Sequence, residues 1–110
     1  MIKTTGGDGL EIGFTEGAIE TIVKKIIEEI PHVRLSGSFL MVEHRVSVIR
    51  CKNSEDQGLY LKVVLDIASG HNIVELGKMV AKTIRSNLFG MTDLNVNMIY
   101  VVFNDIYAEE

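Results

Sequence analysis

The sequence predicts an α+β fold, in which two helices cover one face of a mostly antiparallel sheet. Two stretches, 19–30 and 73–88, repeat apolar residues with the 3.6-residue period of an amphipathic helix. Other stretches alternate with the period of two that is typical of strands: 10–14, 43–52, 59–68 and 94–103. The predicted order is β-α-β-β-α-β, a two-layer sandwich within 110 residues, which is the length of one domain.

The chain begins with a polar, glycine-rich stretch, residues 1–9, which is predicted to be a flexible N-terminal segment. The first strand, Leu10–Phe14, is short and contains Gly13, so it is expected to be a minor edge piece of the sheet. Thr15 is positioned to cap the first helix, and Pro31 is expected to end it. The apolar stripe of this helix is the clearest in the chain: Ile19, Ile22, Val23, Ile26, Ile27 and Ile30.

The middle of the chain is predicted to form a β-hairpin. Residues 32–38 are expected to be a connecting loop, and 53–58 a polar turn between two strands. The second of these strands, 59–68, has the longest clean alternation and is expected to lie at the centre of the sheet. Asp66, near its end, is expected to have a turn or cap role.

The second helix is predicted by its start signal as well as by its period. Asn72 and Glu75 have the spacing of a capping box, and Gly90 is expected at the position just after the helix ends. The last strand, Leu94–Phe103, is apolar on both faces from Ile99 onward. The domain is therefore expected to span residues 10–104, with 105–110 as a C-terminal tail.

Several blocks of the sequence resemble one protein family. They are the helix start G-H-N-I-V-E at 70–75, M-T-D-L at 91–94, V-N-M-I-Y-V at 96–101, and the E-I-G-F-T-E-G-A-I-E-T-I run at 11–22. In order and spacing they resemble the alkaline shock protein 23 family, which comprises cell envelope stress response or general stress proteins, mostly of Gram-positive bacteria. The family has glycine where this chain has Asp93.

The resemblance implies a non-enzymatic interaction or scaffold protein with a role in cell envelope homeostasis or stress response. It also implies a cytoplasmic protein held at the membrane by a separate membrane-anchored partner. The alternative is a small RNA- or ribosome-associated module that uses the basic face of the second helix. A net charge of −4 and the lack of stacking aromatic residues on that face make nucleic acid an unlikely partner.

The composition predicts a cytoplasmic protein without a membrane span. Cys51 is the single cysteine, so the chain cannot form an internal disulfide, which favours a reducing compartment. The first residues carry no apolar run of a signal peptide, and no stretch is apolar enough to cross a bilayer.

No motif indicates catalysis, a cofactor or a metal. The three histidines, His32, His44 and His71, lack ligand spacing such as H-x-x-x-H; the first and last are expected to be surface loop residues, and His44 a partly buried structural one. Cys51 has no neighbouring histidine to activate it and is expected to be a small strand hydrophobe. The chain is therefore predicted not to be an enzyme.

Two surfaces are predicted to mediate interactions. Lys78, Lys82 and Arg85 project from one side of the second helix and are expected to dock a protein partner. On the last strand, Ile99, Val101 and Phe103 are expected to lie on the sheet face that the helices leave uncovered. Such a patch would mediate homo-oligomer formation or partner docking.

Overall fold

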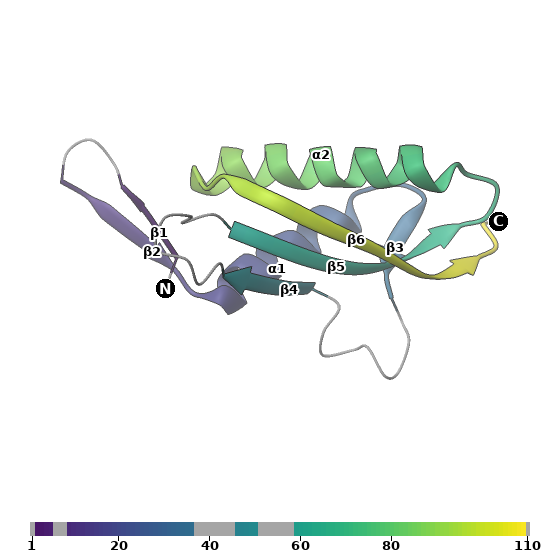
Figure 1. The fold of residues 1–110 in the computed structure, drawn as a ribbon, viewed down its shortest axis with the longest axis horizontal. Helices are drawn as coiled ribbons and strands as arrows, with labels where there is room; N and C mark the ends of the chain where they lie inside the picture. The colour runs from purple at the N-terminus through teal and green to yellow at the C-terminus, as the bar shows by residue number, and fades with distance from the viewer. Residues whose placement is uncertain (1, 6–8, 37–45, 51–58, 110) are drawn as a thin grey trace.

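The computed structural model describes residues 2–5, 9–36, 46–50 and 59–109 and confirms the α+β fold class (Figure 1). Parts of the predicted hairpin, including His44, Cys51 and the turn at 53–58, lie outside the described residues. The elements are β1 (Ile2–Thr5), β2 (Glu11–Phe14), α1 (Glu16–Glu28), β3 (Val33–Leu35), β4 (Val46–Arg50), β5 (Leu59–Ala68), α2 (Ile73–Thr92) and β6 (Val96–Tyr107).

The central strand is β5, as predicted. Both β3 and β4 pair antiparallel with it along one edge, while β6 pairs parallel with it along the other edge. Because α2 connects β5 to β6, the chain crosses over and the two strands run in the same direction. The main sheet is therefore mixed: β3 and β4 pair antiparallel with β5, as expected of a mostly antiparallel sheet, whereas β6 pairs parallel with it. The short strand β3 lies in the stretch predicted to be a loop.

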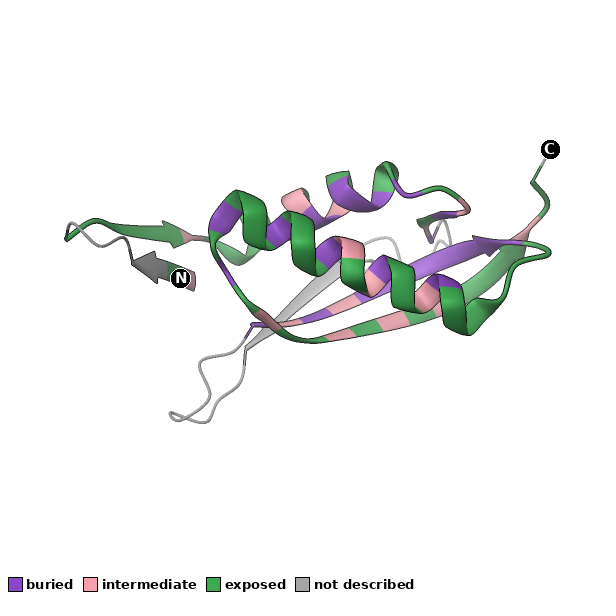
Figure 2. Ribbon diagram, turned by 90° about the horizontal axis from the view of Figure 1, so that it is seen from above, coloured by how far each residue is buried: buried purple, intermediate pink, exposed green. Residues whose placement is uncertain are grey.

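Both helices lie on the same face of the main sheet, as predicted (Figure 2). The burial pattern shows why both helices pack on this face: the apolar stripe of each helix contacts the odd-numbered residues of β5. The fully buried side chains include Ile19, Val23 and Ile27 of α1, Val80, Ile84 and Leu88 of α2, and Leu61, Val63 and Leu65 of β5.

Both predicted helix starts are confirmed. The Thr15 hydroxyl accepts a hydrogen bond from the Ala18 amide at 3.1 Å, and the Asn72 side chain accepts one from the Glu75 amide at 3.0 Å. The predicted end of the second helix at Gly90 is wrong, because α2 continues to Thr92. Asp93 then caps it, with a left-handed φ of 59° and its amide donating to the Phe89 carbonyl at 2.8 Å.

The left-handed conformation of Asp93 predicts that glycine would be more stable there. A side chain in this region costs about 1–2 kcal/mol, and the extra freedom of glycine in the unfolded chain offsets part of the gain. We expect Asp93→Gly to raise the free energy of unfolding by about 0.5–1 kcal/mol, measured by urea denaturation. The control Asp105→Gly, within β6, should lower it. A decrease for both variants would contradict this account of the cap.

The first two strands form a hairpin of their own (Figure 1). β1 pairs antiparallel with β2 from Ile2 opposite Phe14 to Thr5 opposite Glu11, and Lys3 forms an ion pair with Glu11 at 2.8 Å. The prediction of an edge strand in the main sheet is therefore wrong, and residues 2–5 of the segment predicted to be flexible form β1. The partly buried side chains of Ile2 and Phe14 pack against the core and fix the base of the hairpin.

The last strand is longer than predicted, so the expected tail at 105–110 begins inside β6. A register shift explains the difference: Leu65 pairs with Phe103, but Asp66 pairs with Asp105. Asn104 is the extra residue of this bulge, and its side-chain amide donates to the Ser36 hydroxyl at 3.1 Å. The bulge interrupts the alternation of period two, and this interruption hid the last part of the strand.

Candidate functional site

The uncovered sheet face carries different residues from those predicted. Ile99, Val101 and Phe103 pair with Leu61, Val63 and Leu65, which point into the core. The three β6 side chains are accordingly half-buried and packed against the core under the helices. The prediction that these three residues lie on the uncovered face is wrong. The register with β5 places the even-numbered residues of this part of β6 on that face instead.

The uncovered face instead presents an apolar row that we call the open strip: Met98, Tyr100 and Val102. These side chains are 42%, 55% and 38% exposed. On the neighbouring strand Val64, Asp66 and Ala68 lie on the same face but are buried, so this face is exposed along β6 and not along the second half of β5. Within the described residues, β6 pairs with β5 only, and its outer edge has no strand beside it.

The predicted docking residues share one side of α2. Lys78, Lys82 and Arg85 are all exposed, and the Arg85 guanidinium donates to the Asn97 carbonyl at 3.5 Å. Phe89, one turn further along, is 47% exposed and adds an aromatic ring to this side of the helix. This ring weakens the sequence argument that the basic face lacks aromatic residues. The docking role of the three basic residues stays a prediction.

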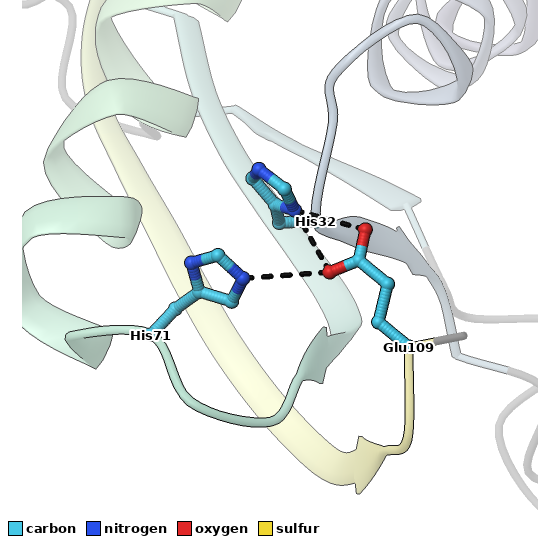
Figure 3. A group of neighbouring side chains, drawn as sticks. All are labelled: His32, His71 and Glu109. Carbon is cyan, nitrogen blue, oxygen red and sulfur yellow. Dashed lines mark hydrogen bonds and ion pairs between the residues drawn. The ribbon is translucent and has the colours of Figure 1, made fainter.

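A third group of side chains lies at the end of the sheet where β5 and β6 finish. His32 precedes β3, His71 lies between β5 and α2, and Glu109 follows β6 (Figure 3). His32 Nδ1 is 3.0 Å from Glu109 Oε1 and 2.9 Å from Oε2, while His71 Nε2 is 3.4 Å from Oε2. The two imidazole rings stack, with their centroids 4.0 Å apart. We call these residues the His–His–Glu cluster.

Backbone hydrogen bonds hold the segments of this cluster together. The Ala68 amide donates to the His32 carbonyl at 2.9 Å, and the Ser69 amide donates to the Tyr107 carbonyl at 2.8 Å. His32 has a φ of 69°, and Gly70 turns the chain after β5 with a φ of 86°. The ends of the three segments are thus fixed relative to one another by the sheet itself.

The electrostatics of the cluster favour an ionised carboxylate. The hydrogen bond from His32 lowers the pKa of Glu109, and His71 adds to this effect, whereas burial acts in the opposite direction. The side chains remain accessible, at 38% exposure for His32, 33% for His71 and 43% for Glu109. An ionised oxygen ligand and two imidazole nitrogens therefore face solvent together.

A separate ion pair lies beside β3 on the uncovered face. Arg34 Nε is 3.6 Å from Asp66 Oδ2, and the Arg34 guanidinium carbon is 4.0 Å from the centre of the Tyr107 ring. Asp66 is only 4% exposed and lies inside β5, so the expected turn or cap role was wrong. This arrangement ties β3 to the end of β6.

Sequence reasoning treated His32 and His71 as unrelated surface loop residues, and it did not consider Glu109. The structure brings the three together because β3 begins where β5 and β6 end. A usable signal existed, since each residue lies within a few positions of a strand end. Using that signal required knowing that β3 exists and where β6 ends. The alternation of apolar and polar residues revealed neither.

The fold and its surfaces define a small α+β domain with a basic helix face, a His–His–Glu cluster and a last strand, β6, that pairs on one side only within the described residues. No described helix is long and apolar enough to cross a membrane. Comparison with known proteins finds no matching family model, no matching curated protein and no matching solved structure.

Proposed function

We propose that this chain is a non-enzymatic scaffold module that assembles by pairing β6 with β6 of a second copy. The observation that carries this proposal is the open strip on β6. Met98, Tyr100 and Val102 are exposed along a strand of 12 residues whose outer edge no described strand covers. A row of exposed apolar residues along the open edge of a sheet is suited to adding another strand.

The composition of β6 supports pairing. Natural edge strands commonly carry lysine or proline, which discourage the addition of a further strand. β6 contains neither, and Asp105 is its one charged residue. Two copies related by a twofold axis would therefore bring their β6 strands together with little charge repulsion.

An antiparallel pair centred on Val101 gives a favourable set of contacts. Tyr100 of one copy would lie opposite Val102 of the other, and symmetry repeats this contact. Pairs of an aromatic and a β-branched side chain contribute roughly 0.2–1 kcal/mol each. The resulting sheet would continue through both copies, and the side chains of the two open strips would lie next to one another and partly shield one another from water.

The cellular role follows from the family resemblance. A scaffold in cell envelope homeostasis needs a second contact for a partner, and the exposed residues Lys78, Lys82 and Arg85 belong to α2, in the helix layer. Paired copies would display several such basic faces to an acidic protein partner, which the resemblance implies is anchored in a membrane.

Sedimentation velocity across the micromolar range tests the proposed assembly. We expect wild type to form a dimer and a Tyr100→Lys, Val102→Lys variant to be monomeric, because both positions are exposed at the pairing edge. The matched control is Val74→Lys on α2, which is also exposed and should leave the dimer intact. A monomeric wild type, or a variant that still dimerises, would contradict the proposal.

A further inference from the structure

We propose that the His–His–Glu cluster is a binding site for a divalent transition-metal ion, with zinc as the best-fitting ion. The ligands would be His32 Nδ1, His71 Nε2 and one carboxylate oxygen of Glu109. This reverses the expectation from sequence spacing, which predicted no metal. It is independent of the proposed assembly, since the cluster lies at the end of the sheet and not on the open strip.

The spacing of the ligand atoms fits a small ion. Ligands about 2.1 Å from a tetrahedral zinc ion lie about 3.4 Å from one another. The three ligand atoms all lie within 4.8 Å of one another, and the nearest contacts are 2.9 Å for His32 and 3.4 Å for His71 with the same carboxylate oxygen. The two stacked imidazole rings would have to turn so that the lone pair of each ligand nitrogen points at the ion, whereas the backbone of the three segments could stay in place.

The backbone around the ligands is already fixed. His32 accepts a hydrogen bond from Ala68 through its carbonyl, and His71 directly precedes Asn72, which caps α2. Glu109 lies two residues after Tyr107, whose carbonyl accepts from Ser69. An ion would therefore bind between segments whose backbone is already fixed, and it would take the place of the hydrogen bonds between the imidazoles and the carboxylate.

The ligand types select the class of ion. Two imidazoles and one carboxylate suit zinc and its neighbours among the divalent transition metals, whereas magnesium and calcium prefer oxygen ligands alone. Three protein ligands leave the fourth position of a tetrahedral ion open to water. The partial exposure of all three side chains gives a free ion direct access from solvent.

Binding would link the segment after β6 to the turns before β3 and before α2. A ligand that binds only the folded chain raises its stability in proportion to the logarithm of free ligand concentration over Kd. Zinc should therefore raise the melting temperature of the full chain, and magnesium should not.

Isothermal titration of the purified full chain with zinc chloride tests the site, with magnesium chloride as a second titrant. We expect one zinc ion per chain and no magnesium binding. The test variants are His71→Ala, Glu109→Gln and His32→Asn, the last because asparagine tolerates the left-handed backbone of this position. Loss of a supporting residue around a metal ligand costs 10–100-fold in affinity, so loss of a ligand should raise Kd by about 100-fold or more.

The matched control is Glu28→Gln, which removes an exposed carboxylate from α1 and should leave zinc affinity unchanged. Circular dichroism of each variant would check that it is folded. As a second measurement, zinc should shift the imidazole nitrogen resonances of His32 and His71 in wild type, which requires no substitution. Absence of zinc binding in wild type would overturn the proposal, and so would wild-type affinity in the folded His71→Ala variant.

Discussion

Replacing Ile27 with alanine is expected to lower the free energy of unfolding by about 4 kcal/mol, near the upper end of the range for buried isoleucine. Ile27 has no exposed surface and belongs to the cluster in which α1, α2 and β5 meet. The cavity left by truncation would be enclosed on all sides, so the surrounding side chains could collapse into it only partly. Urea denaturation monitored by circular dichroism measures the change.

Ile26 provides the matched comparison, because it is the preceding residue of the same helix and the same type of side chain. It is 6% exposed and lines an open groove between the helices with Ile22 and Met91. Solvent and flexible neighbours can fill the space that Ile26→Ala leaves, so we expect a cost of about 2 kcal/mol. Equal costs for the two variants would contradict the packing of α1 described above.

The helices and the central strand could be predicted from the sequence because their patterns are long and unambiguous. α1 and α2 each bury one continuous stripe, and the caps at Thr15 and Asn72 mark where they begin. In β5 the odd-numbered residues belong to the core under the helices, and burial alternates over residues 59–63, whereas from Val63 to Ala68 every residue is buried. For these elements local sequence and tertiary packing agree.

The elements that the sequence did not predict are short or carry ambiguous patterns. β3 has only 3 residues, too few for any period to be measured. β6 is apolar on both faces and contains a bulge, so periodicity could not decide which parity faces the helices. Only the register with β5 resolves that choice, and a register between strands is not a property of one stretch of sequence.

The His–His–Glu cluster was hidden for a related reason. His32 and Glu109 are separated by 77 positions, and His71 and Glu109 by 38. Metal motifs recognised from sequence place ligands a few residues apart on one element, whereas this cluster depends on three strand ends that meet. The spatial arrangement of the sheet, rather than any local motif, creates the candidate site.

The two faces of β6 predict opposite results for the same substitution at neighbouring positions. Val101 packs against the core, so Val101→Asp would place a carboxylate among apolar side chains that offer it no partner. We expect a cost of several kcal/mol, which is a large part of the roughly 5–15 kcal/mol that stabilises a typical domain. The variant should be largely unfolded at room temperature, or should melt far below wild type.

Val102→Asp is the matched control, because Val102 is 38% exposed on the uncovered face. A carboxylate there remains in water, so the loss of monomer stability should stay within about 1 kcal/mol, the span of strand propensities. The same variant should dissociate the proposed dimer, since a twofold pair would bring its two new charges close together. Thermal melts and sedimentation of both variants separate the two effects. A folded Val101→Asp together with an unfolded Val102→Asp would mean that the faces of β6 are reversed, and the open strip would then belong to the core.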